Sequence, residues 1–360
     1  MIYIRVVEEL KSNKKIRLEG KDIAIPWLNL PKLSTVIPGV QKGRYIIVTA
    51  NSKVGKTQIA DYLFLYEPLN YIFSEANKGN LKLKIFYFSL EMSKEDKILQ
   101  MISNKIYNDK QYIVSTDNLR SYFNGYILED RVEKLIDEYK DYFTKVEEVV
   151  TFIDKIRNPF GIYKEIRDYA RNNGKFFLNN GVEVDIEKTG LYDYYIPNDP
   201  NEQVIVITDH ISLLTPEKGE DLHAAMGRYS SDYCLKMRDN FKYTVVNIQQ
   251  QSASSEAKKF NLMGGKLIID SLRPSADDLG DNKLTGRDAD LLIGLFAPNR
   301  YKIKTYEGYD ITQLKDNYRE LSVIFNRRGS STNLDLYFEG AANYFRELKS
   351  DEYRIKFDID

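Results

Sequence analysis

A glycine, a lysine and a threonine at the start of a predicted helix could bind phosphate groups. Gly55-Lys56-Thr57 follows a short β-branched run, residues 45–49, and a polar turn, so a strand, a loop and a helix come in succession. Anions bind readily at such a helix start because backbone N–H groups of the loop and of the first turn point at them. In this arrangement the Lys56 ammonium reaches the β- and γ-phosphates of a nucleotide, and the Thr57 hydroxyl ligates Mg²⁺.

The loop matches the phosphate-binding pattern of a glycine, four residues and Gly-Lys-Ser/Thr, except at its first position. Ala50 stands there, and its side chain is small enough to replace a glycine. The alternative is a chance Gly-Lys-Thr at a helix start, but the strand before it and the helix after it favour the phosphate loop. ATP and Mg²⁺ are therefore the predicted cofactors. The residues expected to contact the nucleotide are Ala50, Asn51, Ser52, Lys53, Val54, Gly55, Lys56 and Thr57.

Three polar residues at the ends of later predicted strands could complete a hydrolytic site. Asp209 follows residues 204–208 and is expected to hold Mg²⁺ through water. Glu91 follows the strand at 84–89 and could polarise the attacking water, while Gln250 could sense the γ-phosphate. Because doubly wound sheets bind ligands at the carboxyl ends of their strands, we expect these side chains to meet at one edge.

Each of these three residues also has an ordinary structural interpretation. Asp209 could be a solvated acid at a strand end, Glu91 a charge in the first turn of a helix, and Gln250 one of three consecutive glutamines. Their order along the chain after a phosphate loop favours the catalytic interpretation of the whole set.

Apolar strands alternate with helices along most of the chain. The expected helices carry apolar residues at helical spacing, and the helix after Glu91 begins at the capping residue Ser93. Apolar strands separated by helices are buried on both faces, so the sequence predicts an α/β fold with a mainly parallel central sheet flanked by helices. Predicted strands cover residues 45–49, 84–89, 204–208, 243–248, 291–296, 321–325 and 333–338, and predicted helices include 57–65, 128–142, 160–172 and 223–241.

This alternation divides the chain into a lead-in, one large domain and a tail. Residues 1–44 are polar and punctuated by prolines, so we expect an N-terminal arm or linker there. Residues 45–345 are expected to form the α/β domain, with a helical and irregular insertion at 107–200 that includes a hairpin or loop at 179–195. Residues 346–360 are expected to form a C-terminal tail.

The composition is that of a globular protein and limits the kinds of site the chain can hold. Of the 360 residues, 42% are hydrophobic and 29% charged, enough for a large core. The formal net charge is -1, from 52 basic and 53 acidic residues, so any nucleic-acid site must be a local patch. One cysteine, Cys234, and two histidines, His210 and His223, argue against a disulfide framework and a Cys- or His-based metal site. No apolar stretch approaches the ~18 residues of a membrane span and no signal-peptide segment is evident, which predicts a cytoplasmic protein without a membrane partner, in the host cytoplasm if the chain is viral.

Several short motifs resemble those of the DnaB-type replicative helicases. Phe-Ser-Leu-Glu-Met at 88–92 resembles the family motif that follows the second strand, and Asn-Arg-Arg-Gly at 326–329 resembles its arginine-finger segment. The resemblance covers about residues 25–345, is weakest across 107–200, and implies a RecA-like P-loop motor domain. Further similar elements are Ile-Pro-Gly-Val-Gln-Lys-Gly at 37–43, Leu-Arg-Pro-Ser at 272–275 and Asp-Ala-Asp at 288–290.

By this resemblance Glu91 is the catalytic base and Arg327 is the finger inserted into a neighbouring subunit's ATP site. Arginine suits that role because its planar, permanently charged fork stabilises charge spread over phosphoryl oxygens. Arg328 could take the role instead, and the alternative for both is a solvated hairpin tip. Phe325 stands where the family usually has a lysine, which leaves the coupling of the finger to a second basic group open. The expected catalytic set is Lys56, Glu91, Gln250 and Arg327.

Two segments could contact nucleic acid. Residues 251–266 are small, flexible and basic and follow the glutamine strand, which suits a loop lining a central channel. By resemblance Arg273 lies in a second DNA-contacting loop, although Asp277 and Asp278 make it locally acidic. The alternative for both segments is a solvated surface loop. The expected DNA contacts are Lys258, Lys259, Lys266 and Arg273.

The resemblance implies an ATP-dependent DNA helicase that translocates on single-stranded DNA as a ring oligomer, expected to be a hexamer, during replication. A primase or a helicase loader is a candidate partner. About forty residues precede the first strand, fewer than the family's N-terminal domain needs, so we expect a motor fragment or a compact viral version. Two other functions share the nucleotide site: a RecA-like recombinase or clock-type ATPase, and an assembly protein that uses nucleotide only as a switch. The Ser-Leu-Glu-Met and late arginine motifs favour the helicase, and the retained Glu91 argues against a switch.

Overall fold

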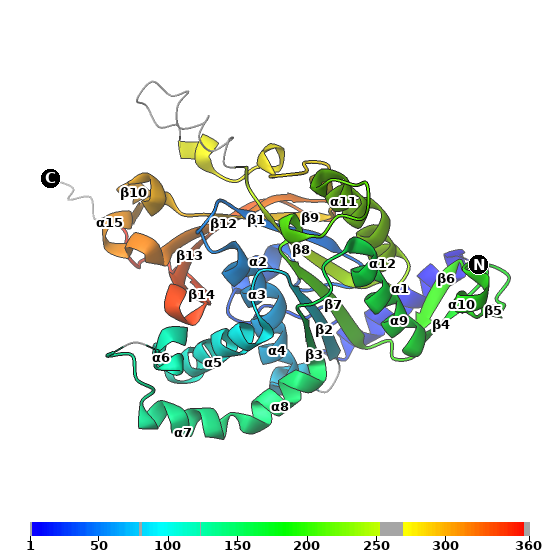
Figure 1. Cartoon of the computed structure of the whole chain (residues 1–360), viewed down its shortest axis with the longest axis horizontal. Helices are drawn as coiled ribbons and strands as arrows, with labels where there is room; N and C mark the ends of the chain where they lie inside the picture. The colour runs from blue at the N-terminus through cyan, green and yellow to red at the C-terminus, as the bar shows by residue number, and fades with distance from the viewer. Residues whose placement is uncertain (1, 79–80, 123, 253–268, 356–360) are drawn as a thin grey trace.

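A nine-stranded sheet forms the centre of the molecule (Figure 1). This computed structural model describes residues 2–78, 81–122, 124–252 and 269–355. The strand order is β14-β13-β12-β9-β1-β8-β7-β2-β3; the strands from β9 to β3 are parallel, and β12, β13 and β14 are antiparallel. The predicted α/β fold with a mainly parallel sheet is therefore confirmed. The strands are β1 Tyr45–Ala50, β2 Lys82–Ser89, β3 Val150–Ile153, β7 Glu202–Asp209, β8 Thr244–Gln250, β9 Leu291–Phe296, β12 Tyr318–Asn326, β13 Thr332–Glu339 and β14 Tyr344–Glu347.

The central strands bury side chains on both faces of the sheet. In β1, Ile46 and Val48 belong to one hydrophobic core, and Tyr45 and Ile47 belong to the other. Successive side chains of a strand point to opposite faces, and every residue of β1 is buried. Each face therefore needs a cover of helices.

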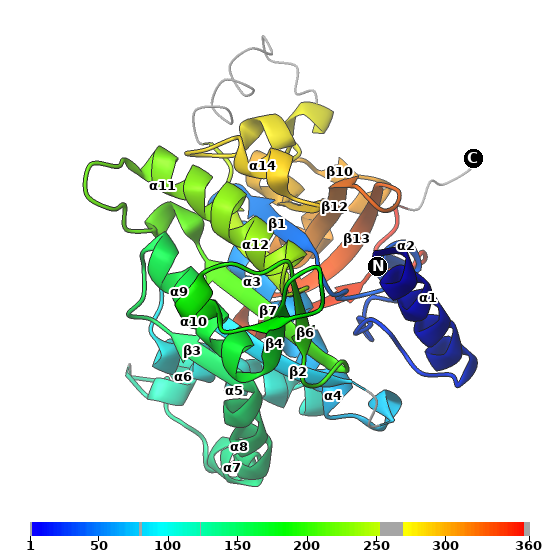
Figure 2. The same cartoon turned by 90° about the vertical axis from the view of Figure 1, so that its right-hand side faces the viewer.

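Helices provide that cover on both sides. α9, α11 and α12 lie together on one face (Figure 2), where Ile162, Met226 and Met237 enter the core. α3, α4, α5 and α8 pack on the opposite face, where Met101 and Val146 are buried. The helices are α1 Ile2–Leu18, α2 Pro31–Val36, α3 Lys56–Asp61, α4 Glu67–Ile72, α5 Lys94–Lys110, α6 Thr116–Arg120, α7 Asp130–Glu138, α8 Lys140–Val149, α9 Pro159–Asn172, α10 Ile186–Thr189, α11 Leu222–Arg228, α12 Leu235–Asp239, α14 Thr285–Asp288 and α15 Ile311–Leu314.

Two of the helices continue through a π-helical stretch. α3 passes through Tyr62–Tyr66 into α4, and α11 passes through Tyr229–Cys234 into α12. Pro68 lies just after the first stretch, at the start of α4. A proline in a helix removes one hydrogen bond and crowds the preceding turn, and a π-turn is one way to accommodate it. The helix predicted at 57–65 consequently extends further, to the end of α4.

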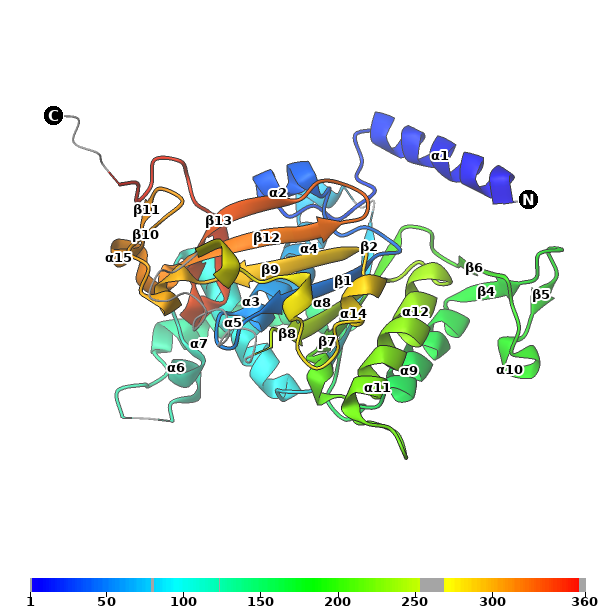
Figure 3. The same cartoon turned by 90° about the horizontal axis from the view of Figure 1, so that it is seen from above.

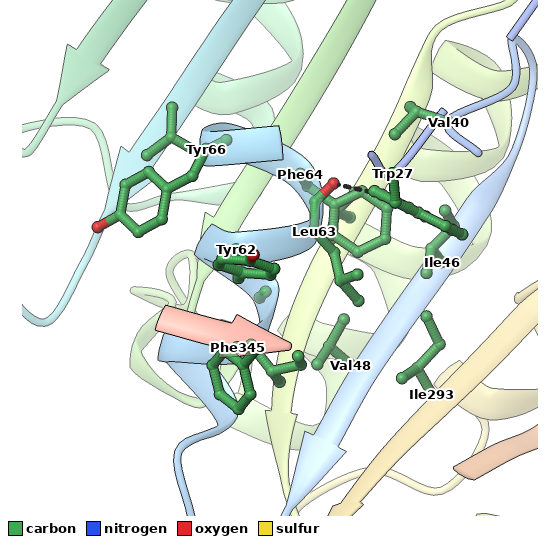
Figure 4. Packing of buried hydrophobic residues seen from close by; sticks show 14 of the residues in the cluster. Trp27, Val40, Ile46, Val48, Tyr62, Leu63, Phe64, Tyr66, Ile293 and Phe345 are labelled. Atoms are coloured by element: carbon green, nitrogen blue, oxygen red, sulfur yellow. Dashed lines mark hydrogen bonds between the residues drawn. The ribbon is translucent and has the colours of Figure 1, made fainter. Parts of the chain in front are cut away.

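The residues before β1 divide into a packed segment and a separate helix. Trp27 and Val40 join the core of the α3 face, and the indole Nε1 of Trp27 donates a hydrogen bond to the main-chain oxygen of Leu63 at 2.7 Å (Figure 4). α1 instead stands apart from the sheet (Figure 3). Its Leu10 and Leu18 side chains are 63% and 78% exposed. The segment expected to be an arm thus contains both core residues and an exposed helix.

The region from 107 to 200 is partly integrated into the domain. It supplies β3 at one edge of the large sheet and α9 over one face. The single helix predicted at 128–142 is wrong, because α7 ends and α8 begins at Tyr139. Tyr139 is buried in a small core with Ile106 and Val132, which holds the two helices at that bend. A separate three-stranded sheet follows, made of β4 Gly174–Phe177, β5 Glu183–Val184 and β6 Tyr194–Pro197.

The described residues after β14 remain in contact with the domain. Leu348 is buried, and Arg354 pairs with Tyr309 of a short two-stranded sheet, β10 Thr305–Tyr306 and β11 Tyr309–Asp310. The segment expected to be a tail therefore packs against the domain up to this point. Among the described helices, none combines the length and the apolar character that crossing a membrane requires.

Candidate functional site

The sheet brings the ends of four parallel strands to one edge. Ala50 at the end of β1 lies opposite Gln250 of β8, and Ser89 at the end of β2 lies opposite Asp209 of β7. This carboxyl edge is where parallel α/β sheets bind ligands.

The loop between β1 and α3 is held in a tight turn at this edge. Gly55, which directly precedes α3, has a φ of 107°. A side chain at that position would be strained, so the glycine is required by the turn itself. The first four N–H groups of a helix have no partner within it, so this turn points backbone donors of Lys56 and Thr57 away from the sheet.

Two arginines from the far end of the sequence hold the loop from behind. The Arg319 Nε donates to the main-chain oxygen of Val54 at 2.7 Å, and the Arg300 Nη1 donates to that of Ser52 at 2.7 Å. Arg319 is almost fully buried, and burial lowers its pKa to about 10. Sequence reasoning missed both residues, because neither belongs to a motif.

The loop opens onto a cleft of about 520 Å³. This volume is within the range of small-molecule sites, roughly 300–1,000 Å³. Of the predicted phosphate-binding residues, Ala50 and Asn51 lie behind it, since both are buried and Asn51 Nδ2 bonds the Tyr301 hydroxyl at 2.9 Å. The cleft is lined by residues 52–58, Glu91, Met92, Gln100, His210, Gln250 and Phe338.

Asp209 lies directly under the loop, fully buried at the end of β7. The Thr57 hydroxyl donates to its Oδ1 at 3.0 Å. Behind it lies the ammonium of Lys97, with no exposed surface, 3.2 Å from the Asp209 Oδ2 and 2.9 Å from the Asp61 Oδ2. The hydroxyl of Tyr87 contacts both carboxylates, at 2.7 Å for Asp61 and 3.1 Å for Asp209.

The charges in this buried cluster influence one another. Burial raises the pKa of the Asp61 carboxyl, against the opposing effect of the Lys97 ammonium. Burial alone would lower the pKa of Lys97, but Asp61 and Asp209 more than compensate, so its pKa lies above the usual value. Lys97 is therefore a charged side chain inside the protein.

Glu91 stands on the other side of the cleft with its side chain 50% exposed. The His210 Nε2 is 3.8 Å from the Glu91 Oε2. Burial, followed by the nearby Lys56 ammonium, lowers the pKa of His210. The imidazole is therefore neutral at pH 7 and leaves the Glu91 carboxylate free of an ion pair with it.

The three consecutive glutamines have different surroundings. Gln249 is buried and its Nε2 donates to the main-chain oxygens of Gly280 and Asn282. Gln251 is also buried, with its Nε2 2.9 Å from the Thr49 hydroxyl oxygen. Gln250, between them, is the one that lines the cleft.

The predicted finger lies at the opposite edge of the sheet. Asn326, the last residue of β12, pairs with Leu291 at the start of β9. Arg327 follows it, exposed, with its main-chain N–H bonded to the Asp290 oxygen at 2.9 Å. Its guanidinium contacts the main-chain oxygen of Arg287. The structure therefore does not bring Arg327 to the cleft of its own chain.

Arg328 and Phe325 flank this position in different ways. The Arg328 Nη2 donates to the main-chain oxygen of Gly43 at 3.3 Å. Phe325 is partly buried against the core of the α9 face, and the pairing of β12 with β9 shifts register between Val323 and Phe325. An apolar residue there serves packing.

The expected DNA contacts are only partly covered by the structure. Lys258, Lys259 and Lys266 lie outside the described residues. The Arg273 guanidinium bonds both oxygens of the buried Glu320 at 2.8 Å, the Tyr306 hydroxyl at 2.7 Å and Glu307 at 2.8 Å. These partners raise the pKa of Arg273 despite the opposing effect of burial. Its charge is therefore engaged within the chain.

A metal ion would have few protein ligands at this edge. Within the described part of the chain, no group of three or more His, Cys, Asp or Glu side chains is arranged to hold one. Mg²⁺ at nucleotide sites takes one or two protein oxygens together with phosphate and water. The adjacent oxygens of Thr57 and Asp209 fit that requirement.

Comparison with solved structures reveals the same fold in helicase ATPase domains. The chain is similar to a DnaB-like replicative helicase, studied with its interactions with primase, at 17% identity and a TM-score of 0.65 over 96% of this chain and 67% of that chain. It is also similar to the solved ATPase domain of a second helicase, at 18% identity and a TM-score of 0.62 over 95% of this chain and 99% of that domain. No protein-family model and no curated protein sequence matches. The resemblance to DnaB-type helicases is thus confirmed at the level of the fold, a RecA-like ATPase domain with a P-loop.

Proposed function

We propose that the chain is an ATP-hydrolysing motor of the DnaB helicase type, which translocates on single-stranded DNA as a ring-shaped oligomer. The observation that carries the proposal is the convergence of five side chains on, or directly behind, one cleft at the carboxyl edge. They come from the loop after β1 and from the ends of β2, β7 and β8: Lys56, Thr57, Glu91, Asp209 and Gln250.

The loop and its two following residues bind the nucleotide. Backbone N–H groups and the Lys56 ammonium cradle the phosphates. Thr57 and Asp209 hold Mg²⁺, which offsets negative charge on the phosphates when it is bound. The 3.0 Å contact between the Thr57 hydroxyl and the Asp209 Oδ1 supports this pairing.

Glu91 is the proposed general base. Its half-exposed carboxylate borders the cleft, where it can accept a proton from water attacking the γ-phosphate. Gln250 faces the same space and can donate its amide to a phosphate oxygen. Because a glutamine gains or loses that bond with the γ-phosphate, it can report hydrolysis to the segment that follows β8.

Arg327 is proposed to act on the cleft of a neighbouring copy of the chain. It lies eight residues along β12 and its following turn from Arg319, which holds the loop, and a strand of that length spans about 26 Å. No single side chain bridges that gap, so a charge from Arg327 can reach a nucleotide only in another subunit. The exposed apolar side chains of α1 support an assembly that covers them.

Single-stranded DNA and a primase are the proposed partners. DNA binding rests on the fold and on the basic segment after Gln250. A primase is proposed because the similar DnaB-like helicase interacts with one. A hexamer is the proposed ring size.

The deciding experiment measures ATP hydrolysis by the full chain with and without single-stranded DNA, alongside its mass by light scattering with ATP present. We expect DNA to stimulate hydrolysis in a ring-sized oligomer and expect that oligomer to displace a strand from a forked duplex. Hydrolysis in a DNA-bound filament without strand displacement would favour a recombinase. A monomer that binds ATP and hydrolyses it slowly, with no response to DNA, would favour a nucleotide switch.

A further inference from the structure

A lysine enclosed within the chain lies directly behind the carboxylate proposed to hold Mg²⁺. The side chains of Lys97, Asp61 and Asp209 are all 0% exposed, although charged side chains are almost never fully buried unless they are paired. Lys97 comes from the first turn of α5, Asp61 from α3, Asp209 from β7 and Tyr87 from β2. Four elements that build the cleft therefore meet at one ammonium group.

The hydrogen bonds of Lys97 use every proton of that ammonium. Its Nζ donates to the Asp61 Oδ2 at 2.9 Å, to the Tyr87 hydroxyl at 2.7 Å and to the Asp209 Oδ2 at 3.2 Å. An ammonium has three donors, so these three bonds satisfy it. The Tyr87 hydroxyl in turn donates to the Asp61 Oδ1 at 2.7 Å. The geometry of the cluster is consequently determined from several directions at once.

This arrangement gives the two oxygens of Asp209 different surroundings. Oδ2 contacts Lys97 and Tyr87 inside the protein, and Oδ1 accepts the bond from the Thr57 hydroxyl beside the cleft. A carboxylate anchored at one oxygen cannot rotate freely about its last bond. Partners that fix the orientation of a metal-holding side chain typically change metal affinity by about 10–100-fold.

The cluster also fixes the segment that carries Glu91. Asp61 lies four residues after Thr57, so both project from the same face of one helix. Lys97 lies six residues after Glu91, in the first turn of the helix that begins beyond it. The contact between Lys97 and Asp61 therefore holds the start of α5 against the helix of the phosphate loop.

We infer that Lys97 is a positioning residue: it anchors the rear oxygen of Asp209, so that the front oxygen faces Thr57, and thereby sets the Mg²⁺ concentration that nucleotide binding requires. This inference rests on the proposed function, because Asp209 has a metal to hold only if the chain binds a nucleotide with Mg²⁺. Asp61 and Tyr87 serve the same end by holding Lys97 in place.

The test titrates Mg²⁺ into the full chain with a fluorescent ADP analogue. In Lys97→Met, the Mg²⁺ concentration at half-maximal binding is expected to rise about tenfold or more, while the weaker binding without Mg²⁺ stays unchanged. Lys97→Arg keeps a cation and should recover part of the response. Lys105→Met is the matched control: Lys105 lies on the same helix and pairs with Asp109 at 2.9 Å, so its loss should not alter the Mg²⁺ requirement.

A double variant separates positioning from stability. Lys97→Met leaves the Asp61 carboxylate buried without its cation and should lower the melting temperature, whereas Lys97→Met with Asp61→Leu removes both charges and should recover it. We expect the raised Mg²⁺ requirement to persist in the double variant. A stable double variant with the wild-type requirement would overturn the inference, because Lys97 would then only balance Asp61. Nucleotide binding by the wild-type chain that ignores Mg²⁺ would overturn the proposed metal site instead.

Discussion

The two edges of the central sheet differ in how completely their functional side chains are used within the chain. At the carboxyl edge, the loop, Asp209 and Lys97 form a connected set whose polar atoms bond one another. At the opposite edge, Arg327 and Arg328 are exposed, and their guanidinium groups contact main-chain oxygens.

This difference indicates which part of the proposed chemistry one chain supplies to itself. Binding the nucleotide and holding its metal depend on residues whose positions are fixed by burial. Stabilising the charge of the transition state depends on arginines that keep their fork available to a group outside the chain. The division explains why one sheet carries both halves of a site without joining them.

The strongest test of the comparison removes one half from each of two variants. Arg327→Ala is expected to lower ATP turnover of the assembled protein by ~10³-fold, because a finger contributes about that much to phosphoryl transfer. Mixing it with Lys56→Ala subunits, which cannot bind phosphate, should restore turnover in clefts that face an intact Arg327. Arg328→Ala is the control and should have a small effect. An equal loss in dilute monomers would show that Arg327 acts within its own chain.

Within the carboxyl edge, Glu91→Gln should separate binding from chemistry. Turnover is expected to fall by ~10²-fold or more, since a general base contributes at least that much, while ATP still binds. Single-turnover hydrolysis and nucleotide binding measured on the same samples check both statements. Glu95→Gln, an exposed acid in the first turn of α5, is the matched control. Normal turnover in Glu91→Gln would remove it from the role of base.

A smaller effect should follow from loosening the loop. Arg319→Met loses the bond from Nε to the Val54 oxygen and should weaken nucleotide binding about tenfold, the effect of a ~1.5 kcal/mol hydrogen bond from a charged group. Arg346→Met is a close match, because Arg346 and Arg319 each lie 4.8 Å from an aromatic ring centroid, of Tyr337 and Phe338 respectively. Titration of a fluorescent nucleotide distinguishes the two. Equal affinities in folded variants would mean that the loop keeps its shape without Arg319.

The smallest effect should come from a residue that serves neither edge. Trp27→Phe keeps the ring in the core and removes the hydrogen bond to the Leu63 oxygen, which should lower the free energy of unfolding by about 1–2 kcal/mol. Nucleotide affinity should stay unchanged. Denaturant unfolding and the same titration check this. A loss of affinity as large as that of Arg319→Met would show that the core and the cleft are not separable.

The sequence predicts those parts of the site that lie in a continuous stretch or at the end of an apolar strand. The phosphate loop is such a stretch, and Glu91 and Asp209 follow strands that composition alone identifies. Lys97 has no comparable signal, because it stands in a charged helix and its contact with Asp209 joins residues 112 positions apart. Arg319 reaches Val54 across 265 positions. Such pairings depend on the tertiary fold.

The same distinction applies to the fold. Apolar runs predict the central strands and a parallel sheet, but their lengths do not reveal that β12 to β14 turn antiparallel at one side. Composition leaves the choice among the three glutamines open, although alternation along a strand already places Gln250 opposite in direction to its neighbours. The separation of α7 and α8 at Tyr139 depends on a small core that helical spacing does not reveal.

The paired strands β12 and β13 reach from one edge of the sheet to the other. At the carboxyl edge they supply Arg319 behind the loop and Phe338 in the cleft, and at the far edge they end beside Arg327. Hydrogen bonds tie the two strands along their length, so they tilt together as a rigid bar. In a ring of the proposed kind, filling one cleft would move the arginine that serves the next, and each subunit would register the nucleotide state of its neighbour mechanically.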